Sequence, residues 1–155
     1  MTTISKTINR RTALKSLAVG GAAVTFGTQL AFAQAEPQVD IGEFKKLVKD
    51  WDSLPFTYDD DAALLVRVPA ADKPERALEV KVAGKKTYLV AYTQVCTHAG
   101  CKPDLKPTHQ LECPCHGSVF NANDGTVKKG PAKQPLAGIK LEVRGANVFA
   151  VGQLK

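Results

Sequence analysis

Short runs of apolar or alternating residues, separated by glycines and polar turns, follow one another from about residue 51 to the C-terminus. Runs of this length with a period of two are typical of β-strands rather than helices. Asn123-Asp124-Gly125 and Arg144-Gly145-Ala146-Asn147 each predict a tight turn between neighbouring strands. The expected strands cover residues 56–58, 63–68, 78–82, 87–94, 118–120, 139–144 and 147–151.

Many short strands in a chain of this size predict an all-β fold, a small antiparallel sandwich or barrel around one core. The β domain is expected to occupy residues 53–155, after a linker over 36–52 that contains a short helix at Ile41–Val48. The segments Asp59–Asp61 and Pro69–Glu75 are rich in charge and turn residues and are expected to form exposed loops.

The first 35 residues do not follow the strand pattern. Asn9-Arg10-Arg11-Thr12-Ala13-Leu14-Lys15 precedes an uncharged stretch, residues 16–35, that ends in the small-x-small patterns Ala31-Phe32-Ala33 and Ala33-Gln34-Ala35. This arrangement resembles a twin-arginine export signal. Twenty uncharged residues can also span a bilayer, so residues 1–35 are expected to be an export signal or a retained membrane anchor. An ordinary amphipathic first helix is the alternative.

The positive charge of the chain is concentrated in the same segment. The whole chain has 21 Lys+Arg and 15 Asp+Glu, a formal net charge of +6. Four of these cations and none of the acids lie before residue 36, which leaves a net charge of +2 on the rest. So small a surplus does not indicate a nucleic-acid partner.

Two segments near the C-terminus hold all four cysteines and two of the three histidines: Cys96-Thr97-His98-Ala99-Gly100-Cys101 and Cys113-Pro114-Cys115-His116-Gly117-Ser118. Each offers one Cys-His pair at metal-ligand spacing and one further cysteine. Two thiolates and two imidazoles suit either a tetrahedral zinc ion or an iron–sulfur cluster with mixed ligation. A zinc site gives no reason for the two further cysteines. His109, in a polar stretch between the segments, is expected to be a solvated loop residue.

These two segments resemble the cluster-binding loops of the Rieske proteins, in the disulfide-bearing, high-potential branch. That branch includes the iron–sulfur subunits of cytochrome bc complexes and the small subunit of arsenite oxidase. The resemblance spans about residues 88–136, and Gly130-Pro131-Ala132 is similar to the family's third, proline-bearing loop. It implies a β fold with the loops as a subdomain at one end. It also implies one [2Fe–2S] cluster, with Cys96 and Cys113 on one iron, His98 and His116 on the other, and a disulfide between Cys101 and Cys115.

The resemblance implies that Ser118, Phe120, Gly130 and Pro131 tune the cluster. The Ser118 hydroxyl is expected to donate a hydrogen bond to a cluster sulfur, which raises the reduction potential. Members of the bc type usually have tyrosine where Phe120 stands, so the loss of one donor predicts a somewhat lower potential here. Ala99 replaces the usual leucine or methionine, which predicts a smaller docking surface beside the first histidine.

The resemblance implies an exported electron-transfer subunit of a respiratory oxidoreductase. The sequence shows no catalytic triad, phosphate-binding glycine loop or paired carboxylates, so it is not expected to turn over a substrate alone. Its expected partner is a cytochrome b/c or molybdopterin subunit, with quinol as one candidate donor. A lasting disulfide requires an oxidising compartment, which indicates the bacterial periplasm or the outer face of the cytoplasmic membrane. The alternatives are a Rieske-type ferredoxin for an oxygenase, expected to lack Cys101, Cys115 and the export signal, and a zinc-stabilised binding module.

Overall fold

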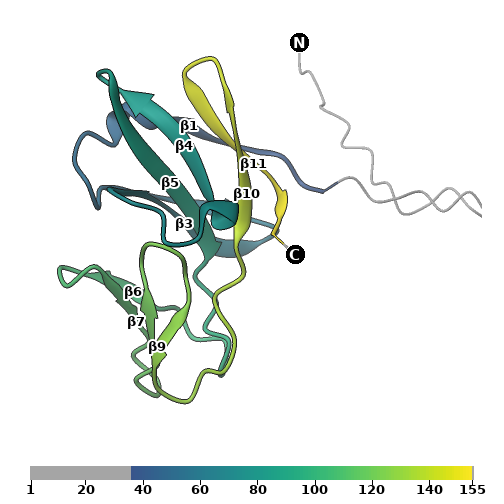
Figure 1. The fold of residues 1–155 in the computed structure, drawn as a ribbon. Coiled ribbons are helices and arrows are strands. Elements are labelled where there is room, and N and C mark those ends of the chain that lie inside the picture. Colours follow the sequence, from purple (N-terminus) through teal and green to yellow (C-terminus); the bar gives the residue numbers. More distant parts are fainter. Residues whose placement is uncertain (1–35, 155) are drawn as a thin grey trace, which may run out of the picture. The chain divides into compact units, whose positions relative to one another are not determined.

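The computed structural model describes residues 36–154, which form three antiparallel sheets (Figure 1). The predicted export signal, residues 1–35, lies outside this part of the chain. In the described part, no helix has both the length and the apolar character needed to cross a membrane. The strands are β1 (Val39–Glu43), β2 (Ser53–Tyr58), β3 (Asp61–Val68), β4 (Ala77–Val82), β5 (Lys85–Thr93), β6 (Asp104–Lys106), β7 (Gln110–Glu112), β8 (Val119–Asn121), β9 (Val127–Lys129), β10 (Ile139–Arg144) and β11 (Asn147–Gln153).

The sheet β2–β3–β5–β4 lies at the centre and contributes to two separate cores. Successive side chains of a strand point to opposite faces, and in β3 Ala63 and Leu65 enter one core while Leu64 and Val66 enter the other. Burial on both faces explains why β3 reads as a continuous apolar run rather than an alternating one.

The first core lies between this sheet and the sheet β1–β11–β10. Leu65 and Leu89 of the central sheet belong to it together with Ile139, Val148 and Ala150 of the second sheet, all at most 1% exposed. Fully burying an aliphatic side chain of this size contributes about 1.5–3 kcal/mol to folding. The expected antiparallel sandwich is therefore confirmed.

The second core joins the central sheet to the small sheet β6–β7–β8–β9. Leu111 and Phe120 of the small sheet are fully buried against Val66 and Val90 of the central one. Figure 1 shows β6, β7 and β9 as a group at one end of the sandwich. The expected loop-bearing subdomain at one end is thus present, and its attachment is hydrophobic.

The linker differs from its prediction. Where a helix was expected over Ile41–Val48, the chain continues β1 to Glu43 and then makes a single 3-10 turn, η1 (Phe44–Lys46). β1 pairs with β11, so the linker contributes an edge strand to the sandwich. The strand wins over the helix because Phe44 and Leu47 are buried in the first core, which fixes the chain against the sheet.

Buried Arg67 holds the end of this linker in place. The Arg67 side chain, on β3, donates to the carbonyl oxygens of Leu47 at 2.8 Å and Val48 at 2.6 Å. It also pairs with the half-exposed carboxylate of Asp50 at 3.2 Å. A buried guanidinium needs such partners, because leaving it unpaired would cost several kcal/mol.

The predicted turns are confirmed, and the two predicted loops are shorter than expected, because Asp61 begins β3 and Pro74 begins the 3-10 turn η2 (Pro74–Arg76). Asp59 and Asp60 form a two-residue hairpin loop between β2 and β3, with φ angles of 51° and 66°. The turn after Asn123 joins β8 to β9, where the Asp124 carboxylate accepts the amide N–H of Thr126 at 2.8 Å. The turn after Arg144 joins β10 to β11, and residues 69–75 are almost all exposed.

One aromatic contact joins the linker to the small sheet. The rings of Trp51 and His109 are stacked, with centroids 4.2 Å apart and planes 6° apart. Both residues have positive φ angles, 74° and 57°, which are unusual for large side chains. His109 is exposed, as predicted, but its ring rests on a partner instead of being surrounded by water.

Replacing His109 with asparagine is expected to lower the free energy of unfolding by about 1 kcal/mol, the worth of one aromatic pair. Asparagine tolerates the left-handed backbone, so the loss reports the ring itself. Trp51 is the single tryptophan of the chain, and its emission is expected to move to longer wavelength as water reaches the indole. Thr108→Ala, one exposed position away, is the control. Equal effects of the two changes would contradict a role for the stack.

Candidate metal centre

The first loop, residues 94–103 between β5 and β6, folds back on itself. The amide N–H of Cys96 donates to the carbonyl oxygen of Cys101 at 2.9 Å, and the amide of Gly100 donates to the carbonyl oxygen of Cys96 at 2.7 Å. Gly100 supplies the positive φ angle of 74° that this turn requires. The turn leaves Cys96 buried at 2% exposure and His98 exposed.

The second loop, residues 113–118 between β7 and β8, repeats this design. The amide N–H of Cys113 donates to the carbonyl oxygen of Ser118 at 2.8 Å, and the amide of Gly117 donates back to Cys113 at 3.1 Å. Cys113 is 3% exposed, whereas His116 is exposed. Each loop therefore offers one thiol facing inward and one imidazole facing outward.

The two loops are joined by the disulfide that the resemblance implied. Cys101 and Cys115 are bonded at an S–S distance of 2.03 Å, with Cα atoms 6.4 Å apart. The rings of His98 and His116 lie edge to face, with centroids 4.8 Å apart. Cys96 and Cys113 remain free thiols. The tertiary fold thus brings all six predicted residues to one place.

The two free thiols affect each other's pKa, and their surroundings shift the two pKa values in opposite directions. Burial raises the pKa of Cys113 and outweighs the amide N–H groups of Cys115 and His116. Burial also acts on Cys96, but the amides of His98 and Ala99 and the neighbouring hydroxyl and thiol donors lower its pKa overall. Donors aimed at a sulfur stabilise a thiolate, the form in which cysteine binds a metal.

A third loop, residues 130–136 after β9, closes over the second. A Cβ atom built on Gly130 would lie 2.6 Å from Cα of Ser118 and 2.8 Å from the carbonyl oxygen of Gly117, so the two backbones are in direct contact. The Thr97 hydroxyl donates to the carbonyl oxygen of Gln134 at 2.6 Å, which ties the first loop to the third. Half-buried Pro131 belongs to this loop; its tuning role, like that of Gly130, stays a prediction.

Ser118 is fully buried and connects the second and third loops. Its hydroxyl oxygen accepts the amide N–H of Ala132 at 3.2 Å. That contact occupies a lone pair and leaves the hydroxyl proton free, and the hydroxyl contributes to the lowered pKa of Cys96. Ser118 therefore joins the second and third loops beside the Cys96 thiol, and the expected hydrogen bond of its hydroxyl to a cluster sulfur stays a prediction.

Three supporting residues were not found from the sequence. Thr97 lies inside the first motif, but nothing in the motif indicates its carbonyl partner. Gln94 donates to the carbonyl oxygen of Pro103 at 2.8 Å and closes the base of the first loop. Arg76 donates to the carbonyl oxygen of Leu136 at 2.8 Å and anchors the end of the third. Both contacts join residues whose proximity depends on the fold.

The donor set fits a mixed thiolate–imidazole centre. The sulfurs of Cys101, Cys113 and Cys115 all lie within 4.8 Å of one another, but the disulfide removes two of them as ligands. The remaining donors are two buried thiols and two exposed imidazoles, which suit a [2Fe–2S] cluster ligated by Cys₂ and His₂.

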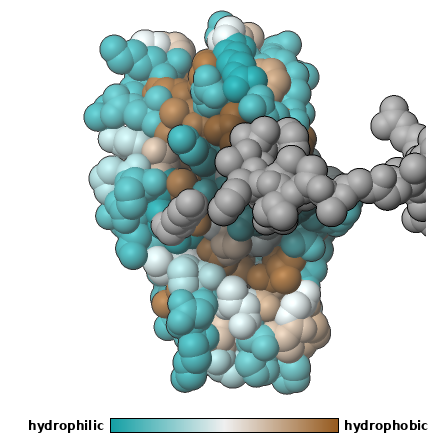
Figure 2. Space-filling view, turned by 90° about the vertical axis from the view of Figure 1, so that its right-hand side faces the viewer, coloured by the Kyte–Doolittle hydropathy of each residue, from teal (hydrophilic) through white to brown (hydrophobic). Residues whose placement is uncertain are grey.

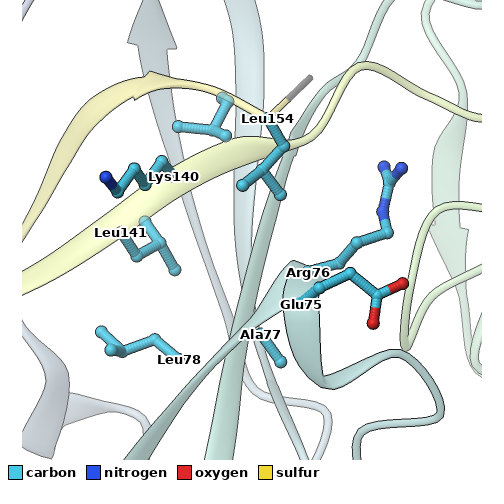
Figure 3. Close-up of a pocket in the computed structure, with 8 residues that line it drawn as sticks. Glu75, Arg76, Ala77, Leu78, Lys140, Leu141 and Leu154 are labelled. Carbon is cyan, nitrogen blue, oxygen red and sulfur yellow. The ribbon is translucent and has the colours of Figure 1, made fainter.

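A hollow of 210 Å³ lies elsewhere, where β4 meets β10 and the turn η2 (Pro74–Arg76). Figure 3 shows Leu78, Leu141 and Lys140 on one side of it, Glu75 and Arg76 on the other, and Leu154 between them. None of its lining residues belongs to the three loops.

The face of the molecule seen in Figure 2 is mixed in hydropathy, with apolar patches among hydrophilic residues.

Comparison with known proteins places this geometry in a family. The model of the Rieske [2Fe-2S] domain matches residues 48–142. The cytochrome b6-f complex iron-sulfur subunit of Gloeobacter violaceus is 46% identical over 71 residues, which cover 39% of this chain and 38% of that protein. The chain thus spans less than half the length of this relative.

Two further comparisons extend over more of the chain. The iodate reductase subunit IdrB of Denitromonas iodatirespirans is 36% identical over 151 residues, covering 88% of this chain and 77% of that protein. The crystal structure of the plasma membrane Rieske protein from Synechocystis PCC 6803 matches with a TM-score of 0.53 and 27% identity, over 72% of this chain and 97% of that one.

Proposed function

The chain belongs to the Rieske [2Fe–2S] family, and from this premise we propose that it is the electron-transfer subunit of a respiratory oxidoreductase, exported to the outer side of the bacterial cytoplasmic membrane. The family's domain holds a single [2Fe–2S] cluster, and so does this chain. One observation carries the proposal: two buried thiols and two exposed imidazoles lie together on loops bridged by a disulfide.

In this proposal Cys96 and Cys113 would hold one iron of the cluster, and His98 and His116 would hold the other. Burial supports this assignment, because both sulfurs face the core while both rings face the surface. The bound cluster supplies one-electron oxidation and reduction. Two neutral imidazoles in place of two thiolates reduce the negative charge at the site and favour a high potential.

The disulfide supports this function over the alternatives. A structural zinc ion would need the four ligands but not the bridge between the loops, and an intracellular ferredoxin would not be expected to keep a lasting disulfide. The same bond supports a location outside the cytoplasm. The motif Asn9-Arg10-Arg11-Thr12-Ala13-Leu14-Lys15 supports the twin-arginine route, which carries folded proteins with their cofactors in place. Fractionation of cells producing the full chain tests the location: recovery of the protein from the cytoplasm alone would contradict export.

For the partner we favour the catalytic subunit of a molybdopterin oxidoreductase, of the kind served by the arsenite oxidase small subunit. The similarity to the iodate reductase subunit extends over 88% of this chain, whereas the similarity to the b6-f subunit covers 39%. Ala99, small and exposed beside His98, also offers little surface for quinol. A cytochrome b partner that oxidises quinol is the second candidate, favoured by the cytochrome-complex relatives.

Potentiometric titration at several pH values, followed by electron paramagnetic resonance, tests the proposed function on the full chain. A Rieske-type signal at positive potential, with the potential falling at alkaline pH, is the expected result. Matured protein that contains zinc and no iron would overturn the electron-transfer function. Purification of the native complex then decides the partner: molybdenum in the complex supports the favoured candidate, and b-type haem supports the second.

Phe120→Tyr is expected to raise the reduction potential. Phe120 is fully buried in the core that also contains Cys96 and Cys113, so a phenol there lies on the sulfur side of the site. One added hydrogen bond of about 1 kcal/mol corresponds to roughly 40 mV for one electron. Phe56→Tyr makes the same chemical change in the other core and serves as the control. An unchanged or lower potential in the Phe120 variant would show that its ring does not face a ligand sulfur.

A further inference from the structure

The three loops of the metal centre, together with the end of β9 and the segment that leads to β10, carry positive charge and no negative charge. Residues 94–103, 113–118 and 128–138 contain no aspartate or glutamate. They contain four lysines, all exposed, and none of the four forms an ion pair with another described residue. We call this set the lysine rim: Lys102, Lys128, Lys129 and Lys133.

Three carboxylates lie on or beside the neighbouring strands, Asp104, Glu112 and Asp124, and none of them forms an ion pair with a rim lysine. Glu112 is separated from Lys129 by Val119 of β8. Asp104 is 3.7 Å from the amine of Lys106, which lies outside the rim. Asp124 is buried and accepts both the amide and the hydroxyl of Thr126. Residues 94–138 therefore have a net charge of +2, whereas the other described residues together have −1. The end of the molecule that holds the metal centre is the positive end.

Lys102 lies on the first loop with His98, Lys128 and Lys129 end β9, and Lys133 lies on the third loop. Lys102 follows Cys101, whose disulfide joins the two ligand loops. Lys129 pairs with Val119 across β8 and β9 and precedes Gly130, which contacts the second loop. Lys133 follows Ala132, whose amide N–H donates to Ser118. An electron that leaves through His98 or His116 therefore crosses a surface flanked by unpaired cations.

We propose that the lysine rim docks an acidic redox protein, a one-electron carrier that presents carboxylates around its own redox centre. The proposal rests on the proposed function, since it names the class of protein with which the exposed histidines exchange an electron. In the forward direction a reduced cluster held by these loops would lose one electron, the oxidised redox centre of the carrier would gain it, and no covalent bond would be made or broken. Opposite charges around the two centres speed the encounter and orient it.

The test uses the full chain with its cluster and two forms of one c-type cytochrome. Native cytochrome of the basic kind keeps its lysines, and succinylation converts those lysines to carboxylates around the same haem. Stopped-flow absorbance follows haem reduction by the reduced protein. At low ionic strength the succinylated form is expected to react at least tenfold faster than the native form, and salt is expected to remove the difference. An equal or faster rate with the native form would overturn the proposal.

The double variant Lys102→Glu with Lys133→Glu is expected to slow the reaction with succinylated cytochrome about tenfold at low salt. Lys81→Glu with Lys85→Glu is the matched control, because it changes the net charge by the same amount. Lys81 is exposed and pairs with Lys86 at the same end of β5 as Lys85. Lys85 is exposed at the start of β5, while the first loop follows the end of that strand, so about 30 Å separates Lys85 from the loops. If the control lost the same rate, the slower reaction of the rim variant would be explained by overall charge alone, and the docking role would be contradicted.

A binding measurement separates docking from electron transfer. With both proteins reduced no electron passes, and calorimetric titration with succinylated cytochrome is expected to show binding that the rim variant loses and the control variant of Lys81 and Lys85 retains. Sedimentation with vesicles of neutral lipid, with and without 30% phosphatidylglycerol, tests for a membrane instead. If the rim binds anionic vesicles but not the acidic cytochrome, the proposal is overturned. Absence of the electron paramagnetic resonance signal would contradict the proposed function. Absence of binding in the calorimetric titration would contradict the docking role of the lysine rim, so the two failures can be told apart.

Discussion

Replacing Gly130 with alanine is expected to lower the free energy of unfolding by about 3 kcal/mol or more and to open the contact between the second and third loops. The new Cβ atom would meet backbone, Cα of Ser118 at 2.6 Å and the carbonyl oxygen of Gly117 at 2.8 Å, so no side-chain rotation relieves the clash. The φ angle of 99° adds backbone strain of about 1–3 kcal/mol. Chemical denaturation measures the stability, and the rate of cluster loss to a chelator measures the opening.

Gly84→Ala separates the two causes. Gly84 has a φ angle of 78°, and a Cβ atom there would meet nothing within 4 Å. The control therefore carries backbone strain without a clash and is expected to leave cluster loss unchanged. If Gly84→Ala and Gly130→Ala had equal effects on stability and on cluster loss, the contact between the loops would not support the site.

Removing the disulfide, with Cys101→Ser and Cys115→Ser together, is expected to leave the fold assembled and the cluster labile. The bond joins residues 14 positions apart, and closing a loop of that length is worth about 3 kcal/mol in the chain-entropy model. Both hydrophobic cores are built from other residues, apart from a peripheral contact of Cys101. The loops can therefore separate while the sheets remain paired.

Circular dichroism in the far ultraviolet checks the fold of this variant, and the decay of the cluster's visible absorbance in the presence of a chelator checks its retention. Dithiothreitol treatment of the unaltered protein, if it reduces the bond, is expected to reproduce the faster decay. Cluster retention that is the same with and without the bond would contradict its role in holding the loops. A variant that fails to fold would show that the bond contributes to the sheets as well.

The two predictions concern different contacts of the same arrangement. The disulfide joins the first loop to the second, while Gly130 lets the third loop approach the second. Because Ser118 lies between them and contacts the third loop through Ala132, damage to either contact is expected to disturb the donors around the Cys96 sulfur. The stability of the centre thus depends on the loops as a set.

The sequence by itself determined the chemistry of the site and the class of the fold. Residue types and spacing within the two motifs limit the donors to thiolates and imidazoles, because these properties are local to a few consecutive positions. The same holds for the β class and for the hairpin at Asn123-Asp124-Gly125, whose turn preference resides in those residues. The pairing of Cys101 with Cys115 followed from family resemblance and was confirmed.

Only the tertiary structure decided which distant residues support that chemistry. Strands β6, β7 and β9 have three residues each, too few for a periodic pattern, and form because Leu111 and its neighbours are buried against the central sheet. The segment expected to be a helix forms the end of edge strand β1 and a 3-10 turn instead, because Phe44 and Leu47 are buried against residues that are distant in the sequence. The Trp51–His109 stack and the position of the lysine rim beside the histidines likewise depend on long-range packing, which a local pattern does not encode.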